Sequence, residues 1–570
     1  SSLESLLMKT FGSLFPRTAL AVAVALVAAA PALAQNTTAA IGGRVTSPDG
    51  QPVAGATVVV LHRESGSVST LTTDADGRYN ARGLRAGGPY TITVSKGGER
   101  SVNDEVYLVL AETTVIDLRL GTAQALEQVV VTSAGGGKIN GTSKGAGTNL
   151  SGQELSAHFS IQRNLQDYAR LDPRIAQTNK ENGEISAAGQ NIRFNSITVD
   201  GVSINDTFGL ESNNLPMARQ PVSMDAIASV QVNLSNYDVT QKGYTGANIN
   251  AVTKSGTNLF KGSAYGVYRD AEMTGRRWNR PPTDTYTRLS SFTEKLFGAT
   301  FSGPIIKDNL FFFLTYEKSE NSISSPAFGV AGSTNATAVN VTQAQIDSVI
   351  AAAKNKWGFD AGTLAIPQGL NLSYEEISAK LNWNVSENHR AEFSFRNSEQ
   401  SEPQLPGFGN TSLSLNSHWY PQDKTNKTYV GQWFADWTDD FSTELKVSKR
   451  DYLSLPIPVS NLPLVTLSWT NGATRSLILG TERSRHFNRL QTKTVDAYFA
   501  GNLFLGDHEL KFGADLAKND IYNAFLQDTR GNYTFSGSGA PGTATDPVTL
   551  FLNGTPTRYQ VQLPLAGRAL

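Results

Sequence analysis

The chain has 570 residues and a mass of 61.2 kDa, which is too long for one compact core and predicts several structural units. Only 39% of the residues are hydrophobic and the mean hydropathy is -0.26, which excludes a bundle of transmembrane helices. A formal net charge of -1 leaves no basic excess for nucleic acid, and the absence of cysteine excludes disulfides and thiol nucleophiles.

Charged residues make up 17% of the chain, whereas glycine is abundant with 51 residues. This balance is typical of strands and turns rather than surface helices. We therefore expect a mainly β protein. The lack of cysteine also suits a protein that is exported to an oxidising compartment.

Residues 1–34 have the pattern of a targeting segment. A basic stretch at 8–17 precedes an apolar run at 18–30 and the small-residue motif Ala-Leu-Ala at 32–34. This order predicts a secretory signal peptide that is cleaved after that motif. The alternative is a membrane anchor, but about 13 apolar residues fall short of the roughly 20 that a spanning helix needs. Residues 1–7 precede a convincing initiator methionine and are interpreted as an upstream extension.

Residues 41–120 alternate short β-rich runs with turn signals about a dozen residues apart, which predicts a small β-sandwich. The stretches at 43–46, 52–58 and 73–79 resemble the carboxypeptidase regulatory-like domain, which has a transthyretin-like fold. No peptidase activity is implied, because His62 is the only histidine of the unit. The motif that begins at Asp74 could open a calcium loop, but its twelfth position lacks the acid that such a loop requires, so a tight turn is favoured.

Residues 126–132 read Leu-Glu-Gln-Val-Val-Val-Thr and are followed by the glycines 135–137. Three successive valines indicate high strand propensity, and the glycine tract indicates a hinge. No partner strand is apparent nearby. The segment is interpreted as a strand that pairs with another sheet, and the alternative is the last strand of the sandwich.

Four blocks follow in a fixed order, and the first is expected to form a short amphipathic helix stopped by a proline. The blocks are residues 164–175, 195–206, 224–232 and 245–258. Together they resemble the plug domain of TonB-dependent outer-membrane receptors. In detail, the amino-acid sequences of these blocks are similar to the Oar-like (OmpA-related) subgroup, which also carries an N-terminal regulatory-like sandwich. The resemblance implies a plug domain at 133–258 and a TonB box at 126–132. It also implies a set of TonB-binding residues, namely Glu127, Gln128, Val129, Val130, Val131 and Thr132.

The remaining residues, 259–570, show the alternation of a transmembrane β-barrel, with apolar side chains at every second position, as at Phe297, Ala299 and Phe301. A helix is expected at 342–357, within a long connection. Aromatic residues near strand ends are assigned to membrane-interface girdles, namely Trp383, Trp433, Trp437 and Tyr498, and the alternative is that they are ordinary core residues. Short turns are expected at 304–308, 386–388, 439–440 and 505–507, and long polar external loops at 271–293, 319–373, 400–426 and 453–490.

About ten strands are counted, with 259–268 as the first and 558–564 as the last. Plugged transporters use about 22 strands, so ten could not close around a plug. The expected fold class is therefore mainly β, with a transthyretin-like sandwich, an α+β plug and the first part of a transmembrane barrel. The chain, which stops at Leu570, is interpreted as an N-terminal fragment.

The resemblance implies active transport across the outer membrane of a Gram-negative cell, with the sandwich and plug on the periplasmic side. The expected partners are TonB with its inner-membrane energising complex, outer-membrane lipid and an unknown extracellular substrate. Similarity to the Oar-like subgroup favours a peptide or protein, and import and export both stay open. The alternative is a non-transporting adhesin or assembly scaffold, in which a plug would have no purpose.

An enzyme is not expected. The six histidines show no metal-ligand spacing. A Gly-x-Ser-x-Gly motif occurs at 141–145, but it lies in the glycine-rich linker without the following helix of a nucleophile elbow. We therefore expect no catalytic residue, no metal and no cofactor.

Overall fold

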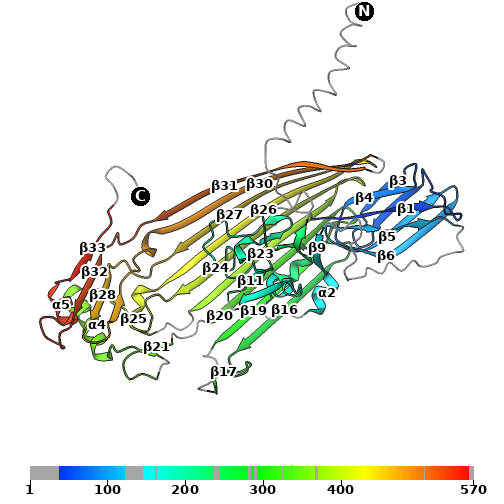
Figure 1. The fold of residues 1–570 in the computed structure, drawn as a ribbon. Helices are drawn as coiled ribbons and strands as arrows, with labels where there is room; N and C mark the ends of the chain where they lie inside the picture. The colour runs from blue at the N-terminus through cyan, green and yellow to red at the C-terminus, as the bar shows by residue number, and fades with distance from the viewer. Residues whose placement is uncertain are drawn as a thin grey trace, which may run out of the picture.

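The computed structural model describes residues 37–121 and 145–563, apart from short gaps at 159, 161–162, 181, 237–242, 280–283, 288–291, 323–326, 335–336, 366–369 and 506–507. Strands dominate these residues (Figure 1), which confirms the mainly β fold class. The predicted signal peptide and the predicted TonB-binding segment at 127–132 lie outside the described residues.

The N-terminal unit, here called the sandwich, consists of two sheets packed face to face. Alternate side chains such as Val58 and Ile92 from one sheet meet Ile41 and Tyr79 from the other in one buried core. The first sheet contains β1 (Ala39–Thr46), β4 (Arg78–Leu84), β7 (Thr113–Val115) and β8 (Leu118–Arg119). The second contains β2 (Thr57–His62), β3 (Val68–Thr72), β5 (Gly87–Lys96) and β6 (Glu99–Leu108).

Residues 145–258 form the central unit, a mixed five-stranded sheet with short helices and its own core. The helix predicted at 164–175 is only α3 (Leu165–Ala169), capped by the Asn164 side chain. It ends before Pro173, which has no N–H to donate. The sheet order is β13 (Val202–Ser203), β12 (Ser196–Val199), β15 (Asn248–Thr253), β14 (Ile227–Asn236) and β9 (Gly145–Ser151). The remaining elements are α2 (Gly152–Ala157), the hairpin of β10 (Ile175–Asn179) and β11 (Glu184–Ala187), and the 3-10 turns η1 (Ile192–Phe194) and η2 (Met224–Ala226).

The third unit, the long sheet, has nine antiparallel strands, each paired with the next one along the chain. Its strands are β16 (Lys261–Asp270), β19 (Thr293–Ile306), β20 (Leu310–Ser322), β23 (Asn371–Asn384), β24 (His389–Gln404), β26 (Tyr420–Thr438), β27 (Phe441–Pro456), β30 (Asn488–Leu505) and β31 (His508–Phe525). Within the described residues, β16 and β31 are its two unpaired edges. The strand predicted at 558–564 is wrong for this sheet, because β33 (Arg558–Gln560) pairs with a strand of another sheet.

Burial in the long sheet is inverted relative to a water-soluble protein. On β23, Ile377 and Trp383 are 50% and 46% exposed, whereas Glu376 and Lys380 are 1% and 6% exposed. Since side chains alternate along a strand, one face is apolar and outward and the other is polar and covered, as in a membrane barrel. The assignment of Tyr498 to a girdle is wrong, because it lies on the covered face at 6% exposure, out of phase with the outward Phe499.

A fourth unit, the cap, is built from the long connections at one end of the long sheet (Figure 1). The predicted helix at 342–357 is confirmed as α4 (Gln343–Trp357). Among the described residues no helix is long and apolar enough to cross a membrane. The cap sheet has the order β25 (Ser412–Ser414), β29 (Arg475–Leu479), β28 (Leu464–Trp469), β32 (Asn532–Gly537) and β33, and it packs on α4 and α5 (Pro547–Asn553).

The long connections predicted at 319–373, 400–426 and 453–490 are present, but they differ from the predicted polar loops in two respects. The strands continue into them, since ladder hydrogen bonds do not depend on side-chain polarity. The same stretches also supply apolar strands and helices to the cap core. Smaller elements in the connections are β17 (Arg277–Asn279), β18 (Thr285–Thr287), β21 (Phe328–Gly329), β22 (Thr337–Ala338), η3 (Asn416–His418) and η4 (Arg485–Phe487).

Candidate functional site

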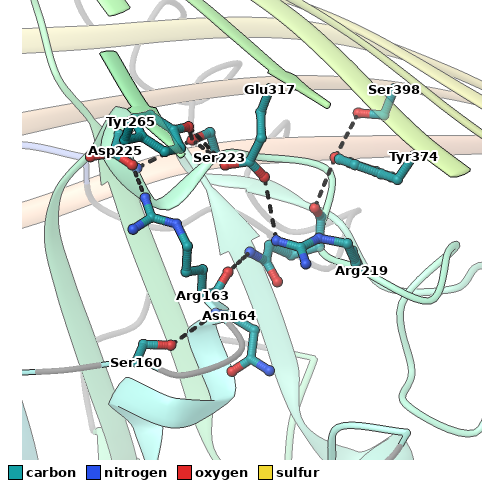
Figure 2. A network of polar contacts seen from close by, with 11 residues as sticks. Ser160, Arg163, Asn164, Arg219, Ser223, Asp225, Tyr265, Glu317, Tyr374 and Ser398 are labelled. Atoms are coloured by element: carbon teal, nitrogen blue, oxygen red, sulfur yellow. Dashed lines mark hydrogen bonds and ion pairs between the residues drawn. The ribbon is translucent and has the colours of Figure 1, made fainter. Parts of the chain in front are cut away.

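The central unit lies against the polar face of the long sheet, and a buried carboxylate joins them (Figure 2). Glu317 on β20 is 1% exposed and lies 3.3 Å from Arg219 of the central unit. It also accepts hydrogen bonds from the hydroxyls of Ser223, at 3.0 Å, and of Tyr265 on β16, at 2.8 Å. One carboxylate therefore ties two strands of the sheet to one loop of the central unit.

The same loop is held by further polar contacts in Figure 2. Arg163 pairs with Asp225, and its guanidinium lies 4.5 Å from the centre of the Tyr265 ring. Tyr374 on β23 donates to the carbonyl of Gln220 at 3.0 Å, and the Gln220 side chain donates to the carbonyl of Arg163 at 2.9 Å. These contacts connect the loops at 163 and 219–225 to one another and to the sheet.

A second group centres on Lys380 of β23, which is buried. Its ammonium lies 3.2 Å from Glu392 on β24 and 3.7 Å from Asp200 at the end of β12. Burial alone would raise the pKa of Asp200, but the charges of Lys380 and Arg396 and the hydrogen bonds from Thr253 hold that pKa below its ordinary value. Asp200 is therefore the ionised acceptor of this group.

A third group lies where the loops after β13 meet β26 and β27. Lys424 approaches Glu211 to 2.6 Å. Arg450 donates to the carbonyls of Ser203, at 2.9 Å, and Asn205, at 3.0 Å. Each of the three groups therefore pairs a charged side chain of the sheet with a polar group of the central unit.

This polar interface differs from a domain core in how it can open. Phe313 of the sheet belongs to the core cluster of the central unit, but the other contacts described above are ion pairs, hydrogen bonds and one cation–π contact. Such contacts contribute little net free energy, because burying the charges offsets most of their attraction. Water can also replace them when the surfaces separate. The arrangement therefore suits a unit that is held in place and can be withdrawn.

The predicted TonB-binding residues Glu127, Gln128, Val129, Val130, Val131 and Thr132 lie outside the described residues. The described chain stops at Gly121 of the sandwich and resumes at Gly145 in β9, so the segment joins the sandwich to the central unit. The interface residues Arg219, Glu317 and Lys380 were not predicted from the sequence. Glu317 and Lys380 could have been found, because both occupy positions that the alternation of their strands assigns to the covered face.

Comparison with known proteins agrees with this architecture. Residues 40–121 match the carboxypeptidase regulatory-like domain, and residues 252–356 match an outer membrane beta barrel domain. The TonB-dependent transporter Oar of Myxococcus xanthus is 28% identical over 315 residues, which cover 53% of this chain and 28% of that protein. Over these residues the chain is a homologue of that transporter, in agreement with the predicted Oar-like resemblance.

The similarity to this transporter and the match to an outer membrane beta barrel domain confirm the predicted outer-membrane localisation. The chain spans less than a third of the length of the Oar transporter that it matches. Among solved structures, the outer membrane transporter YddB of Escherichia coli gives a TM-score of 0.47 at 12% identity, over 69% of this chain and 50% of that one. A mutant of the ferric enterobactin receptor PfeA of Pseudomonas aeruginosa gives 0.44 at 14% identity, over 70% and 52%. The proteins named here are transporters and receptors.

Proposed function

We propose that the protein carries out TonB-dependent active transport of a large or scarce substrate across the outer membrane. The observation that carries the proposal is the mainly polar contact between the central unit and the covered face of the long sheet, whose other face is apolar and outward. In this proposal the central unit is the plug, and residues 259–570 contribute to the barrel that it blocks. We also propose that the chain has no catalytic activity.

The proposed partner is TonB, together with the inner-membrane complex that energises it. In this proposal TonB binds Glu127–Thr132 by adding that segment as a strand to the edge of its own sheet. Strand addition draws its affinity mainly from main-chain hydrogen bonds. A pull on the segment would reach the central unit through β9, which among the described strands is an edge strand paired only with β14.

The proposed substrate is a peptide or protein, which follows from the similarity to the Oar-like subgroup. The sandwich and the central unit are proposed to face the periplasm, and the cap is proposed to face the medium. In support, the cap is built from the long connections and lies at the end of the sheet opposite the short turns (Figure 1). Short periplasmic turns and long external loops are typical of outer-membrane barrels.

The test is capture of the periplasmic domain of TonB by the full-length protein. Val130→Pro removes a donor and fixes φ, so it should abolish capture, whereas Val130→Ile should leave capture within twofold of the wild type. Both variants should reach the outer membrane in normal amounts. Equal capture by the wild type and Val130→Pro would contradict the assignment and would return the segment to the sandwich as its last strand.

A further inference from the structure

The sandwich lies against the short turns of the long sheet, at the end opposite the cap (Figure 1). At the turn between β26 and β27, the amide of Thr72 donates to the Asp439 carboxylate at 3.2 Å. At the turn between β19 and β20, Gly66 lies so close to Asp308 that an added Cβ would be 2.4 Å from a carboxylate oxygen. No larger residue fits at Gly66 unless Asp308 moves.

Two arginines of the sandwich contact strand ends beside the two other short turns. Arg82 pairs with Glu509 at 2.6 Å, beside the turn between β30 and β31, and its guanidinium lies 4.8 Å from the ring centre of Phe504. Arg85 lies 3.5 Å from the Asn384 side chain, beside the turn between β23 and β24. The sandwich therefore contacts the sheet at or beside each of four successive connections.

The sandwich also contacts the central unit. The carbonyl of Leu110 accepts a hydrogen bond from Gln231 on β14 at 3.1 Å. The carboxylate of Glu112 accepts one from Asn149 on β9 at 2.6 Å. The loop between β6 and β7 therefore contacts the edge strand that lies next in the chain after residues 122–144. The sandwich therefore contacts both the long sheet and the central unit, which would separate from each other if the central unit were withdrawn.

These contacts are polar and in part solvent-exposed, so they can be broken and remade. The carboxylate and ammonium of Glu64 and Lys261 lie 2.6 Å apart, with side chains that are 36% and 48% exposed. Glu509 is 40% exposed in its pair with Arg82. Exposed ion pairs of this kind contribute little stability each, and several of them together favour one orientation.

We propose that the sandwich is a second barrier on the short-turn side of the sheet, docked across the four turns and the central unit at rest and released when TonB pulls. This inference rests on the proposed function, since the force enters through residues 127–132. These residues follow the end of the sandwich in the chain, so a pull on them acts on the sandwich as well as on β9. A substrate that passed the central unit would otherwise meet the docked sandwich.

The test uses cysteine pairs in the full-length protein, and the cysteine-free chain gives no background from its own residues. The reporting pair is Thr72→Cys with Asp439→Cys, which a short bis-maleimide joins only when the sandwich is docked. The control pair is Thr57→Cys with Thr72→Cys, which are neighbours across β2 and β3 within the sandwich. The probe is the bis-maleimide itself, so no substrate has to be known.

In cells that lack TonB, the reporting pair should crosslink nearly completely. In energised cells with TonB, its yield should fall at least twofold, and a protonophore or Val130→Pro should restore it. The control pair should give the same yield throughout. Low yield without TonB would show that the sandwich does not dock, and unchanged yield on energisation would show that it is not released.

A charge exchange tests the docked geometry without TonB. Arg82→Glu should lower the yield of the reporting pair at least twofold, and Arg82→Glu with Glu509→Arg should restore it. Failure of the exchange to restore the yield would contradict the docked arrangement. The proposed function has its own readout, because TonB capture that depends on Val130 would stand even if the yield never changed. The proposed function would be overturned if the crosslinking yield did not depend on TonB and the full-length protein also failed to capture the periplasmic domain of TonB.

Discussion

Glu317 shows how single residues hold the central unit in place. It is 1% exposed, and its neighbours Arg219, Ser223 and Tyr265 all direct polar hydrogens at one carboxylate. Removing the negative charge leaves the Arg219 guanidinium in a covered site without its ion-pair partner. That loss costs more than the intact pair contributes, because desolvation is no longer compensated.

We expect Glu317→Gln to reduce the resistance of the central unit to urea by about 1–3 kcal/mol, since a buried charge loses its partner. Arg219→Gln should cost a similar amount, and the double variant should cost less than the sum. The measurement is protease cleavage of the central unit across a urea series. The control is Glu320→Gln, which removes an exposed pair with Lys318 and should be nearly silent. If the losses of stability from Glu317→Gln and Arg219→Gln simply added in the double variant, the ion pair between them would be contradicted.

His62 makes the sandwich sensitive to acid. Burial, followed by the charges of Arg85, Arg390 and Lys261, lowers the pKa of His62 from 6.5 to about 3. Its ring packs against Tyr90, and the ring nitrogen Nδ1 lies 2.7 Å from the Ser65 hydroxyl. Arg390 and Lys261 belong to the long sheet, so docking itself opposes protonation of this histidine.

Above about pH 6.5 His62 is neutral in the folded and unfolded states, so it has no effect on stability. Between pH 6.5 and about 3 the unfolded state binds the proton and the folded state does not. The free energy of unfolding should therefore fall with decreasing pH, by at most about 1.4 kcal/mol per pH unit from this residue. Urea unfolding of the sandwich at several pH values measures the slope, and His62→Gln should make it shallower. An identical slope in the variant would contradict the assignment.

At the scale of elements, the cap has a core of its own. Leu467 on β28 and Leu477 on β29 are completely buried, and they pack in one cluster with residues of α4, α5 and β32. The helix α4 begins at a capping box made by Thr342 and Gln345, and it ends at Gly358 in the left-handed region. The cap therefore has the features of an independently packed unit rather than of loose loops.

We expect Leu467→Ala to loosen the cap and leave the long sheet intact. Removing a fully buried leucine costs about 2–5 kcal/mol of local stability. Proteolysis of the full-length protein should then cleave within 457–487 and 526–557 sooner than in the wild type. The control is Leu552→Ala on α5, where the side chain is 37% exposed and the change should be nearly neutral. Accelerated cleavage at the short turns of the sheet would instead show that the cap and sheet are one cooperative unit.

The elements also show where sequence reasoning succeeds. The hairpins of the long sheet were predictable, because pairs such as Phe297 and Phe301 alternate with covered residues and short turns join neighbours. The cap sheet could not be predicted in this way. Residues Leu464–Trp469 of β28 alternate like the strands of the long sheet, but β28 pairs in parallel with β32, which follows two long strands later in the chain. The ion pair of Asp200 and Lys380 was out of reach for the same reason, since alternation gives the face of each residue and not its distant partner.

At the scale of the whole molecule, the docking of the sandwich should depend on ionic strength. Its partly exposed pairs, Arg82 with Glu509 and Glu64 with Lys261, are open to screening by salt. Raising the salt concentration from about 0.1 to about 1 M shortens the Debye length from about 10 to about 3 Å. In purified protein without TonB, the crosslinking yield between Cys variants at positions 72 and 439 should fall, and that between positions 57 and 72 should not. A yield independent of salt would point to apolar docking.

The parallel pairing of β28 with β32 ties the cap to the order in which the protein is made. At the moment residues 464–469 have been synthesised, the strand that completes their sheet does not yet exist, because β30 and β31 lie between. Bringing the ends of so long a loop together is slow, and β28 can pair with β32 only after β30 and β31 have been synthesised. We therefore expect the cap sheet to be completed only after the ninth strand of the long sheet has been made.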